Sequence, residues 1–195
     1  MVSFIKTDKS FLKVFSYEKY SELIDKCVEE VKDDLVIKPP IKFMGKVVHQ
    51  QRDVGFFSDE SIGYHYSNQL AASKPLKSNL MELMKIVNTQ FNIEYNGILV
   101  NRYIGGDNYI SDHSDNEKTL DESGVIAISQ GVVRKFRIRE KETKKQRKKV
   151  IDVPTTSYSV IQMGGDFQKE FTHGIPVEKK VTGVRYSFTF RTHLE

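Results

Sequence analysis

The second half of the chain is built from short segments with the composition of β-strands. These segments are rich in β-branched or aromatic residues, are separated by turn residues, and cover residues 97–104, 125–130, 133–140, 150–153, 157–163 and 183–191. Gly131 separates two of them so closely that we expect a tight hairpin there. Many short strands in succession indicate antiparallel sheets with short connections.

Two amphipathic helices are expected in the first half. After Ser16, which is suited to cap a helix N-terminus, apolar residues recur at helical spacing over residues 17–35. A second helix is expected over residues 76–91, and the intervening residues 41–75 favour short strands and exposed loops. Helices followed by many antiparallel strands indicate a mainly β member of the α+β class. We expect a double-stranded β-helix, the cupin-like jelly roll, supported by N-terminal helices.

Composition restricts the class of protein and its surroundings. The chain has 195 residues, of which 38% are hydrophobic and 29% charged, so it is expected to be globular rather than disordered or fibrous. Its net charge of +4 is compatible with a polyanionic partner. The single cysteine, Cys27, excludes an internal disulfide and a multi-cysteine zinc site.

Targeting signals are missing from the sequence. The segment starting at Met1 lacks the apolar run of a secretory signal, and no stretch is long enough to cross a bilayer. With one cysteine, a reducing compartment is the simpler assumption. We therefore expect an intracellular monomer, cytoplasmic or nuclear, with no membrane partner.

A candidate metal site is formed by His113, Asp115 and His173. His113 and Asp115 are two positions apart, so in an extended segment both side chains face the same side and reach one metal ion. His173 follows a later predicted strand. Two histidines and one carboxylate are the ligand set of non-haem iron oxygenases, which leaves one face of the octahedron open. Solvated loop histidines would explain the same residues.

The segment 185–191 combines two arginines with strand alternation. Polar side chains alternate with aromatic ones, and the polar set is Arg185, Ser187, Thr189 and Arg191. Inward-facing arginines are costly to bury without anionic partners. A dicarboxylate such as 2-oxoglutarate supplies such partners, since arginine binds carboxylates bidentately. The alternative is an amphipathic edge strand with its arginines in water.

These motifs together resemble the AlkB-like nucleic-acid dealkylases, especially the eukaryotic DNA- and RNA-repair members. The resemblance covers roughly residues 43–195 and is densest from residue 97 onward. The residues that carry it are, in chain order, Asn101-Arg102-Tyr103, His113-Ser114-Asp115-Asn116-Glu117, the segment 126–131 with Arg134 and Phe136, the segment 168–176, and the segment 185–191.

The resemblance implies one dioxygenase domain over residues 1–195. Residues 1–96 would form the helical support and a nucleotide-recognition lid, and residues 97–195 the jelly-roll core. Fe(II), O2 and the cosubstrate 2-oxoglutarate would hydroxylate an N-alkyl group of a DNA or RNA base, while 2-oxoglutarate becomes succinate and carbon dioxide. The hydroxylated alkyl group then leaves the base as an aldehyde.

The resemblance also implies a role for each residue of the metal and cosubstrate sites. Iron would be bound by His113, Asp115 and His173. The cosubstrate 2-oxoglutarate would be bound by Asn101, Tyr103, Arg185, Ser187, Thr189 and Arg191. Ser187 stands where many relatives carry asparagine, and its hydroxyl still offers one hydrogen-bond donor.

The resemblance further implies that residues 63–67 form a lid that recognises the base. Tyr66 would stack on a flipped base, with Tyr64 and Ser67 making polar contacts, although strand aromatics covering the core would also explain both tyrosines. Asn116 and Glu117 would face the polar edge of the base, and a solvated turn is their alternative. Arg52 matches an arginine at the start of the lid region, with a surface salt bridge as its alternative.

A lysine-rich segment over residues 141–149 lies between two predicted strands, so we expect it to form a projecting hairpin loop. Its lysines would lie near phosphates and give salt-sensitive, sequence-independent affinity for alkylated DNA or RNA, single or double stranded. A solvated loop is the alternative. The lysines are Lys144, Lys145, Lys148 and Lys149.

Two other functions fit parts of the pattern. A protein hydroxylase of the prolyl type shares the iron ligands and the fold class, but usually binds 2-oxoglutarate through one basic residue, whereas this chain has Arg185 and Arg191. A catalytically silent nucleic-acid-binding module would have no need of buried charges. An enzyme that demethylates bases, in DNA repair or RNA demethylation, therefore remains the leading hypothesis.

Overall fold

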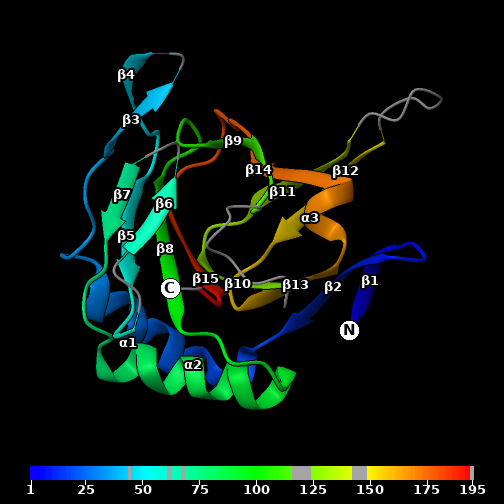
Figure 1. The fold of residues 1–195 in the computed structure, drawn as a ribbon, viewed down its shortest axis with the longest axis horizontal. Helices are drawn as coiled ribbons and strands as arrows, with labels where there is room; N and C mark the ends of the chain where they lie inside the picture. Colours follow the sequence, from blue (N-terminus) through cyan, green and yellow to red (C-terminus); the bar gives the residue numbers. More distant parts are fainter. Residues whose placement is uncertain (44, 61–62, 67–68, 116–123, 142–148, 194–195) are drawn as a thin grey trace.

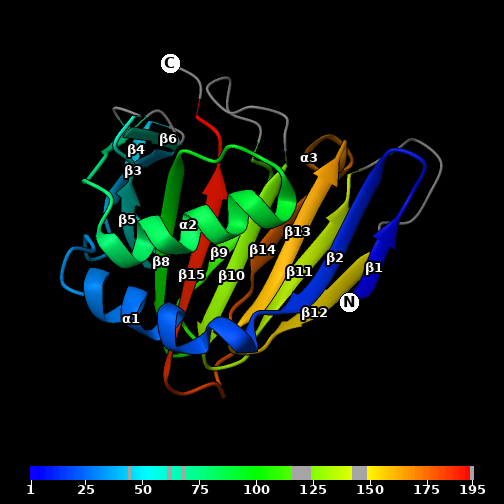
Figure 2. The ribbon, with the colours of Figure 1, turned by 90° about the horizontal axis from the view of Figure 1, so that it is seen from below.

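The protein folds into three layers: two helices, a large sheet and a small sheet (Figures 1 and 2). The computed structural model describes residues 1–43, 45–60, 63–66, 69–115, 124–141 and 149–193, without the side chains of residues 43, 64–66 and 69–71. Within the described part of the chain, none of the helices combines the length and apolar character needed to span a membrane.

The two sheets are antiparallel and form the sandwich. The large sheet has the order β1 (Val2–Lys6), β2 (Ser10–Ser16), β13 (Ser159–Gly165), β10 (Val125–Gly131), β15 (Val184–Arg191), β8 (Gly97–Ile104) and β5 (Asp53–Phe57). The small sheet has the order β12 (Val150–Thr155), β11 (Arg134–Glu140), β14 (Phe171–Ile175) and β9 (Ile110–His113). The expected jelly-roll class is confirmed.

The hairpin predicted around Gly131 is wrong. β10 pairs with β13 and β15 in the large sheet, whereas β11 pairs with β12 and β14 in the small one. The chain therefore crosses from one sheet to the other at this point. Gly131 has a φ of 98°, and a Cβ there would lie 2.1 Å from the Val184 carbonyl oxygen, so only glycine fits the crossing.

The large sheet draws strands from both sides of residue 96. β1, β2 and β5 precede that residue and still belong to the sheet, so the first part of the chain is more than helical support. Ile5 and Leu12, from the first hairpin, are buried in the core between the two sheets. The strands expected after residue 97 form with shifts of at most two residues at each end.

The helices cover the outer face of the large sheet (Figure 2). The first predicted helix is shorter than its pattern, comprising a 3-10 turn at Glu18–Tyr20 followed by α1 (Ser21–Val31), and the second is α2 (Ser78–Phe91). Ile98 and Val100 of β8 pack toward these helices. Because side chains alternate along a strand, the residues of β8 that alternate with Ile98 and Val100, among them Asn101, face the inside of the sandwich.

Short elements flank the sandwich. The ribbons β3 (Pro40–Phe43) with β4 (Lys46–His49), and β6 (Gly63–Tyr66) with β7 (Gln69–Ala72), lie on the side of β5 (Figure 1). The short strands expected within residues 41–75 are thus confirmed. The one-turn helix α3 (Phe167–Glu170) lies between β13 and β14 in the chain and was not predicted.

Arg134, at the start of β11, is a buried cation that holds two loops together. Only 1% of its surface is exposed. Its guanidinium donates to the carbonyl oxygens of Gly105 (2.9 Å), Asn108 (2.8 Å) and Pro176 (2.7 Å), and to Oε2 of Glu178 (3.1 Å). Because these partners lie in the segments after β8 and β14, Arg134 ties both loops to the small sheet.

Candidate metal centre and adjoining pocket

His113, Asp115 and His173 converge on one point inside the sandwich. β9 pairs with β14 so that His113 and His173 are direct cross-strand partners, and Asp115 follows two residues after His113. One ligand atom from each residue lies within 4.8 Å of the others. Because both histidines lie on paired strands and His173 is buried, solvated loop histidines do not account for the site.

Both imidazoles present Nε2 to the carboxylate. His113 Nε2 lies 3.7 Å from Asp115 Oδ1, and His173 Nε2 lies 3.6 Å from Asp115 Oδ2. The other nitrogen of His113, Nδ1, lies 2.9 Å from the Ser111 carbonyl oxygen. A carbonyl only accepts, so Nδ1 carries the proton and Nε2 offers its lone pair to the centre.

Burial keeps the two histidines neutral. Burial, followed by the nearby His113, lowers the pKa of His173 from 6.5 to about 3, and burial also lowers the pKa of His113. The ring of Phe136 stacks on His173 with centroids 5.1 Å apart and fixes its plane. Neutral imidazoles are the form that binds metal ions.

Asp115 is held in place and kept ionised. Its backbone N–H donates to Oε1 of Gln168 in α3 (2.9 Å), and Arg191 Nη2 donates to Asp115 Oδ1 (2.6 Å). Burial raises the pKa of Asp115, but the charge and hydrogen bond of Arg191, together with the electrostatic interaction with the two imidazoles, outweigh burial and lower it from 3.8 to about 2. The carboxylate is therefore negative at neutral pH.

The donor set fits a divalent iron site. Asp115 Oδ2 is buried and accepts no hydrogen bond from any residue that the structure describes. A buried carboxylate oxygen without a donor is costly, and a cation among the three ligand atoms would satisfy it. Two imidazoles and one carboxylate on one side suit Fe(II) and leave positions for other ligands.

Arg185 lies inside the sandwich beside this centre. It is 2% exposed, because β15 is an interior strand between β10 and β8, so the alternative of an edge strand in water is wrong. Its Nε donates to Thr155 Oγ1 (3.0 Å) and its Nη2 to Ser129 Oγ (2.8 Å). Nη1 is buried and has no hydrogen-bond partner among the described residues. Burial lowers the pKa of Arg185 to about 10, so it remains a cation at neutral pH.

One cavity joins the metal ligands and the arginines. The Tyr103 ring lies 5.3 Å from the Arg185 guanidinium. The polar residues that line this cavity are Arg52, Asn101, Tyr103, His113, Asp115, His173, Arg185, Ser187, Thr189 and Arg191. A pocket whose apolar walls carry buried cations beside three metal-ligating side chains is suited to a small dianion. All residues expected around iron and 2-oxoglutarate thus lie together.

The residues expected to bind nucleic acid are described only in part. Arg52 is buried and lines the cavity, so a surface salt bridge does not account for it. Tyr64 and Tyr66 lie on β6, without described side chains. Outside the described residues lie Ser67, Asn116, Glu117, Lys144, Lys145 and Lys148.

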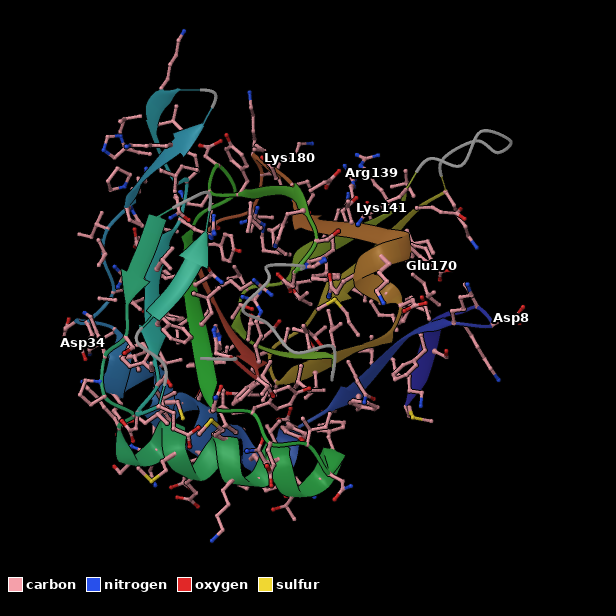
Figure 3. The ribbon with its side chains drawn as sticks, in the orientation of Figure 1. Asp8, Asp34, Arg139, Lys141, Glu170 and Lys180 are labelled. Atoms are coloured by element: carbon pink, nitrogen blue, oxygen red, sulfur yellow. The ribbon has the colours of Figure 1, made fainter. Side chains whose placement is uncertain are left out.

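The lysine-rich segment connects two paired strands, as expected, because β11 and β12 form a hairpin. Lys149, at its end, is exposed. Lys141, at its start, donates through Nζ to the Gln168 carbonyl oxygen (2.7 Å), and Figure 3 shows it near Glu170 of α3. The segment therefore leaves the sandwich beside the helix that holds Asp115.

Four residues of the site had no assigned role in the sequence. Ser129, Phe136 and Gln168 lie within the motifs that carry the family resemblance, and they contact Arg185, His173 and Asp115, respectively. A role for them follows only from contacts between distant strands. Thr155, which accepts from Arg185, carries no sequence signal, because a threonine at a strand end is unremarkable.

His193, which packs against Phe56, is expected to make the protein less stable in acid. Burial, followed by the charge of Arg191, lowers its pKa from 6.5 to about 4. Between these values only the unfolded chain binds the proton, so the free energy of unfolding falls as pH drops through this window. In urea denaturation of the metal-free protein at about pH 7 and about pH 4.5, His193→Gln should lose less stability than wild type. An equal loss in both proteins would contradict this.

Known proteins share both the sequence pattern and the fold. A family model described as the 2OG-Fe(II) oxygenase superfamily matches residues 9–191. The chain is 26% identical over 189 residues to the Homo sapiens protein named DNA oxidative demethylase ALKBH2, covering 94% of this chain and 72% of that protein. The Arabidopsis thaliana protein of the same name is 26% identical over 181 residues, which cover 79% of this chain and 57% of that protein. A solved structure, "The structure of OsALKBH1", matches with a TM-score of 0.59 at 15% identity, covers 93% of this chain and 97% of that one, and shows the shared fold.

Proposed function

Because the chain belongs to the 2OG-Fe(II) oxygenase superfamily, we propose that it oxidatively removes N-alkyl groups from nucleic-acid bases. The observation that carries this proposal is the buried cluster of His113, Asp115 and His173 in one cavity with Arg185 and Arg191. For the substrate, support comes from relatives named DNA oxidative demethylase that align with most of the chain. The whole chain is proposed to act as one dioxygenase domain.

His113, Asp115 and His173 would hold Fe(II), which with O2 and 2-oxoglutarate supplies the oxidation of an N-methyl group. The chain's own contribution is to keep both imidazoles neutral and Asp115 ionised. Arg191 donates to Asp115 Oδ1 and so fixes the carboxylate while Oδ2 stays directed at the ligand cluster. Such contacts to a metal ligand tune its orientation and basicity.

Arg185 is proposed to bind one carboxylate of 2-oxoglutarate. Thr155 and Ser129 hold two of its nitrogens, which leaves Nη1 for the cosubstrate. Further contacts are proposed from Asn101, Tyr103, Ser187, Thr189 and Arg191, which line the same cavity. Ser187 reaches less far than an asparagine would, so the other donors carry more of the binding.

Arg185→Met is expected to weaken 2-oxoglutarate binding by roughly a hundredfold, because a buried carboxylate would lose its cation. Arg185→Lys should bind with intermediate affinity, since lysine keeps the charge without the planar fork. Calorimetric titration of the Mn(II)-loaded protein measures both. Arg137→Met is the matched control, because Arg137 pairs with Asp152 on the outer surface. An Arg185→Met variant that binds like this control would contradict the assignment.

Alkylated DNA is the proposed substrate, and we extend the proposal to RNA and to single or double strands. A flipped base would stack on Tyr66, contact Tyr64 and Ser67, and meet Asn116 and Glu117 at its polar edge. Phosphates would be contacted by Lys144, Lys145, Lys148 and Lys149. The enzyme is proposed to act as a monomer in the nucleus or cytoplasm, where such substrates occur.

The proposal is tested with oligonucleotides that each carry one methylated base. Protein, Fe(II), ascorbate and 2-oxoglutarate are incubated with single- and double-stranded DNA and RNA versions, and mass spectrometry follows the loss of the methyl group. Demethylation of at least one base is expected. No demethylation on any oligonucleotide, together with a peptide that gains one oxygen, would favour a protein hydroxylase. Binding without turnover of 2-oxoglutarate would favour a silent module.

A further inference from the structure

We propose that Arg52 is a positioning residue that orients the Asn101 side-chain amide so that its NH2 group points to bound 2-oxoglutarate. The sequence resemblance instead assigns Arg52 to contact with the nucleic acid. The inference rests on the role proposed above for Asn101, and it adds a residue that acts through Asn101.

The strand register brings Arg52 to the inside of the sandwich. Arg52 immediately precedes β5, which pairs with β8 so that Val54 lies opposite Asn101. Side chains alternate along a strand, so Arg52 and Val54 share the face on which Asn101 lies. Arg52 is 4% exposed and lines the same cavity as Asn101 and His113.

The contact between the two side chains fixes which end of the amide faces the cavity. Arg52 Nε donates to Asn101 Oδ1 at 2.7 Å. A guanidinium has only donors, so the amide oxygen must face Arg52 and the NH2 group must face away from it. Asn101 Nδ2 donates to no residue that the structure describes, although Asn101 is buried. The cavity suits a dicarboxylate, so an N–H donor directed into it can donate to a carboxylate oxygen of the bound molecule.

The neighbouring ion pair leaves this arrangement undisturbed. Asp53, next to Arg52 in the chain, points to the opposite face of β5, where it accepts from Arg102 Nε (2.8 Å) and from the Lys38 backbone N–H (3.1 Å). Its negative charge is therefore engaged away from the cavity.

A double-mutant cycle tests the coupling. Binding of 2-oxoglutarate to the Mn(II)-loaded protein is measured by calorimetry for Arg52→Met, Asn101→Ala and the double variant. Each single change is expected to raise Kd by roughly tenfold, and the double variant by no more than that, because both changes abolish the same contact of the Asn101 amide with 2-oxoglutarate. A multiplied effect of roughly a hundredfold, or an unchanged Kd in Arg52→Met, would overturn the inference.

Control variants distinguish a positioning role of Arg52 from a loss of folding, and from an error in the role proposed for Asn101. Arg102→Met breaks the comparable contact on the outer face of the same strands and should leave the Kd for 2-oxoglutarate unchanged, with Mn(II) affinity unchanged in all variants. Arg52→Lys keeps a buried donor and should recover part of the affinity if Arg52→Met folds poorly. An unchanged Kd in Asn101→Ala contradicts the proposed function's assignment, whereas an unchanged Kd in both Arg52 variants contradicts only this inference.

Discussion

Asp115→Asn is expected to reduce 2-oxoglutarate turnover by on the order of a thousandfold, because it removes the only anionic ligand of the cluster. Asparagine has nearly the same shape and can still accept from Arg191 through its amide oxygen, so the fold around it should persist. The amide that replaces Oδ2 is a poor ligand, and its NH2 group would point at the two histidines. Loss of metal affinity, rather than loss of folding, is thus the expected cause.

Asp112→Asn is the matched control for this change. Asp112 precedes His113 directly, but it is partly exposed and pairs with Arg139 on the outer surface. Its replacement should leave turnover within about twofold, since exposed ion pairs contribute little. Metal affinity is measured by calorimetric titration with Mn(II), and turnover by succinate release. Turnover in Asp115→Asn that matches turnover in Asp112→Asn would remove Asp115 from the metal site.

Arg134→Met is expected to cost about 3–5 kcal/mol of unfolding free energy, the loss typical of breaking a buried ion pair. The carbonyl oxygens of Gly105, Asn108 and Pro176 would lose their shared donor, and Glu178 would lose its cation. Buried acceptors without donors cannot be rehydrated when the surrounding strands stay packed. Urea denaturation followed by circular dichroism measures the loss.

Arg137→Met tests whether burial is the reason for the effect of Arg134→Met. Arg137 lies on the same strand, and its pair with Asp152 has two hydrogen bonds, at 2.7 and 2.8 Å, but both side chains are partly exposed. The same substitution should therefore cost less than about 1 kcal/mol. If both variants lost equal stability, the buried network of Arg134 would not hold the two loops as described.

The residues of the metal and cosubstrate sites could be predicted from the sequence because the patterns that identify them are local. The spacing of His113 and Asp115 places two ligands on one side of an extended segment, and the alternation from Arg185 to Arg191 places two cations on one face of a strand. The structure brings these residues and His173 into one cavity. Local alternation thus predicted which faces point inward.

Features that depend on pairing between distant segments could not be predicted from the sequence. β10 and β11 are adjacent in the chain and yet lie in different sheets, because the jelly roll alternates between its layers. β1 and β2, at the start of the chain, join the large sheet because β2 pairs with β13, which begins only at Ser159. Arg52 was expected to contact the substrate, with a surface salt bridge as the alternative, because only the pairing of the following strand β5 with β8 brings it to Asn101.

The central claim is that one cavity couples 2-oxoglutarate turnover to the removal of an alkyl group from a base. It is tested most directly by counting succinate and demethylated base in the same reaction, with Fe(II) and a methylated oligonucleotide that the protein accepts. We expect one succinate for each base demethylated, and neither product without 2-oxoglutarate. Demethylation that proceeds without 2-oxoglutarate, or succinate release that no methylated oligonucleotide increases, would contradict the claim.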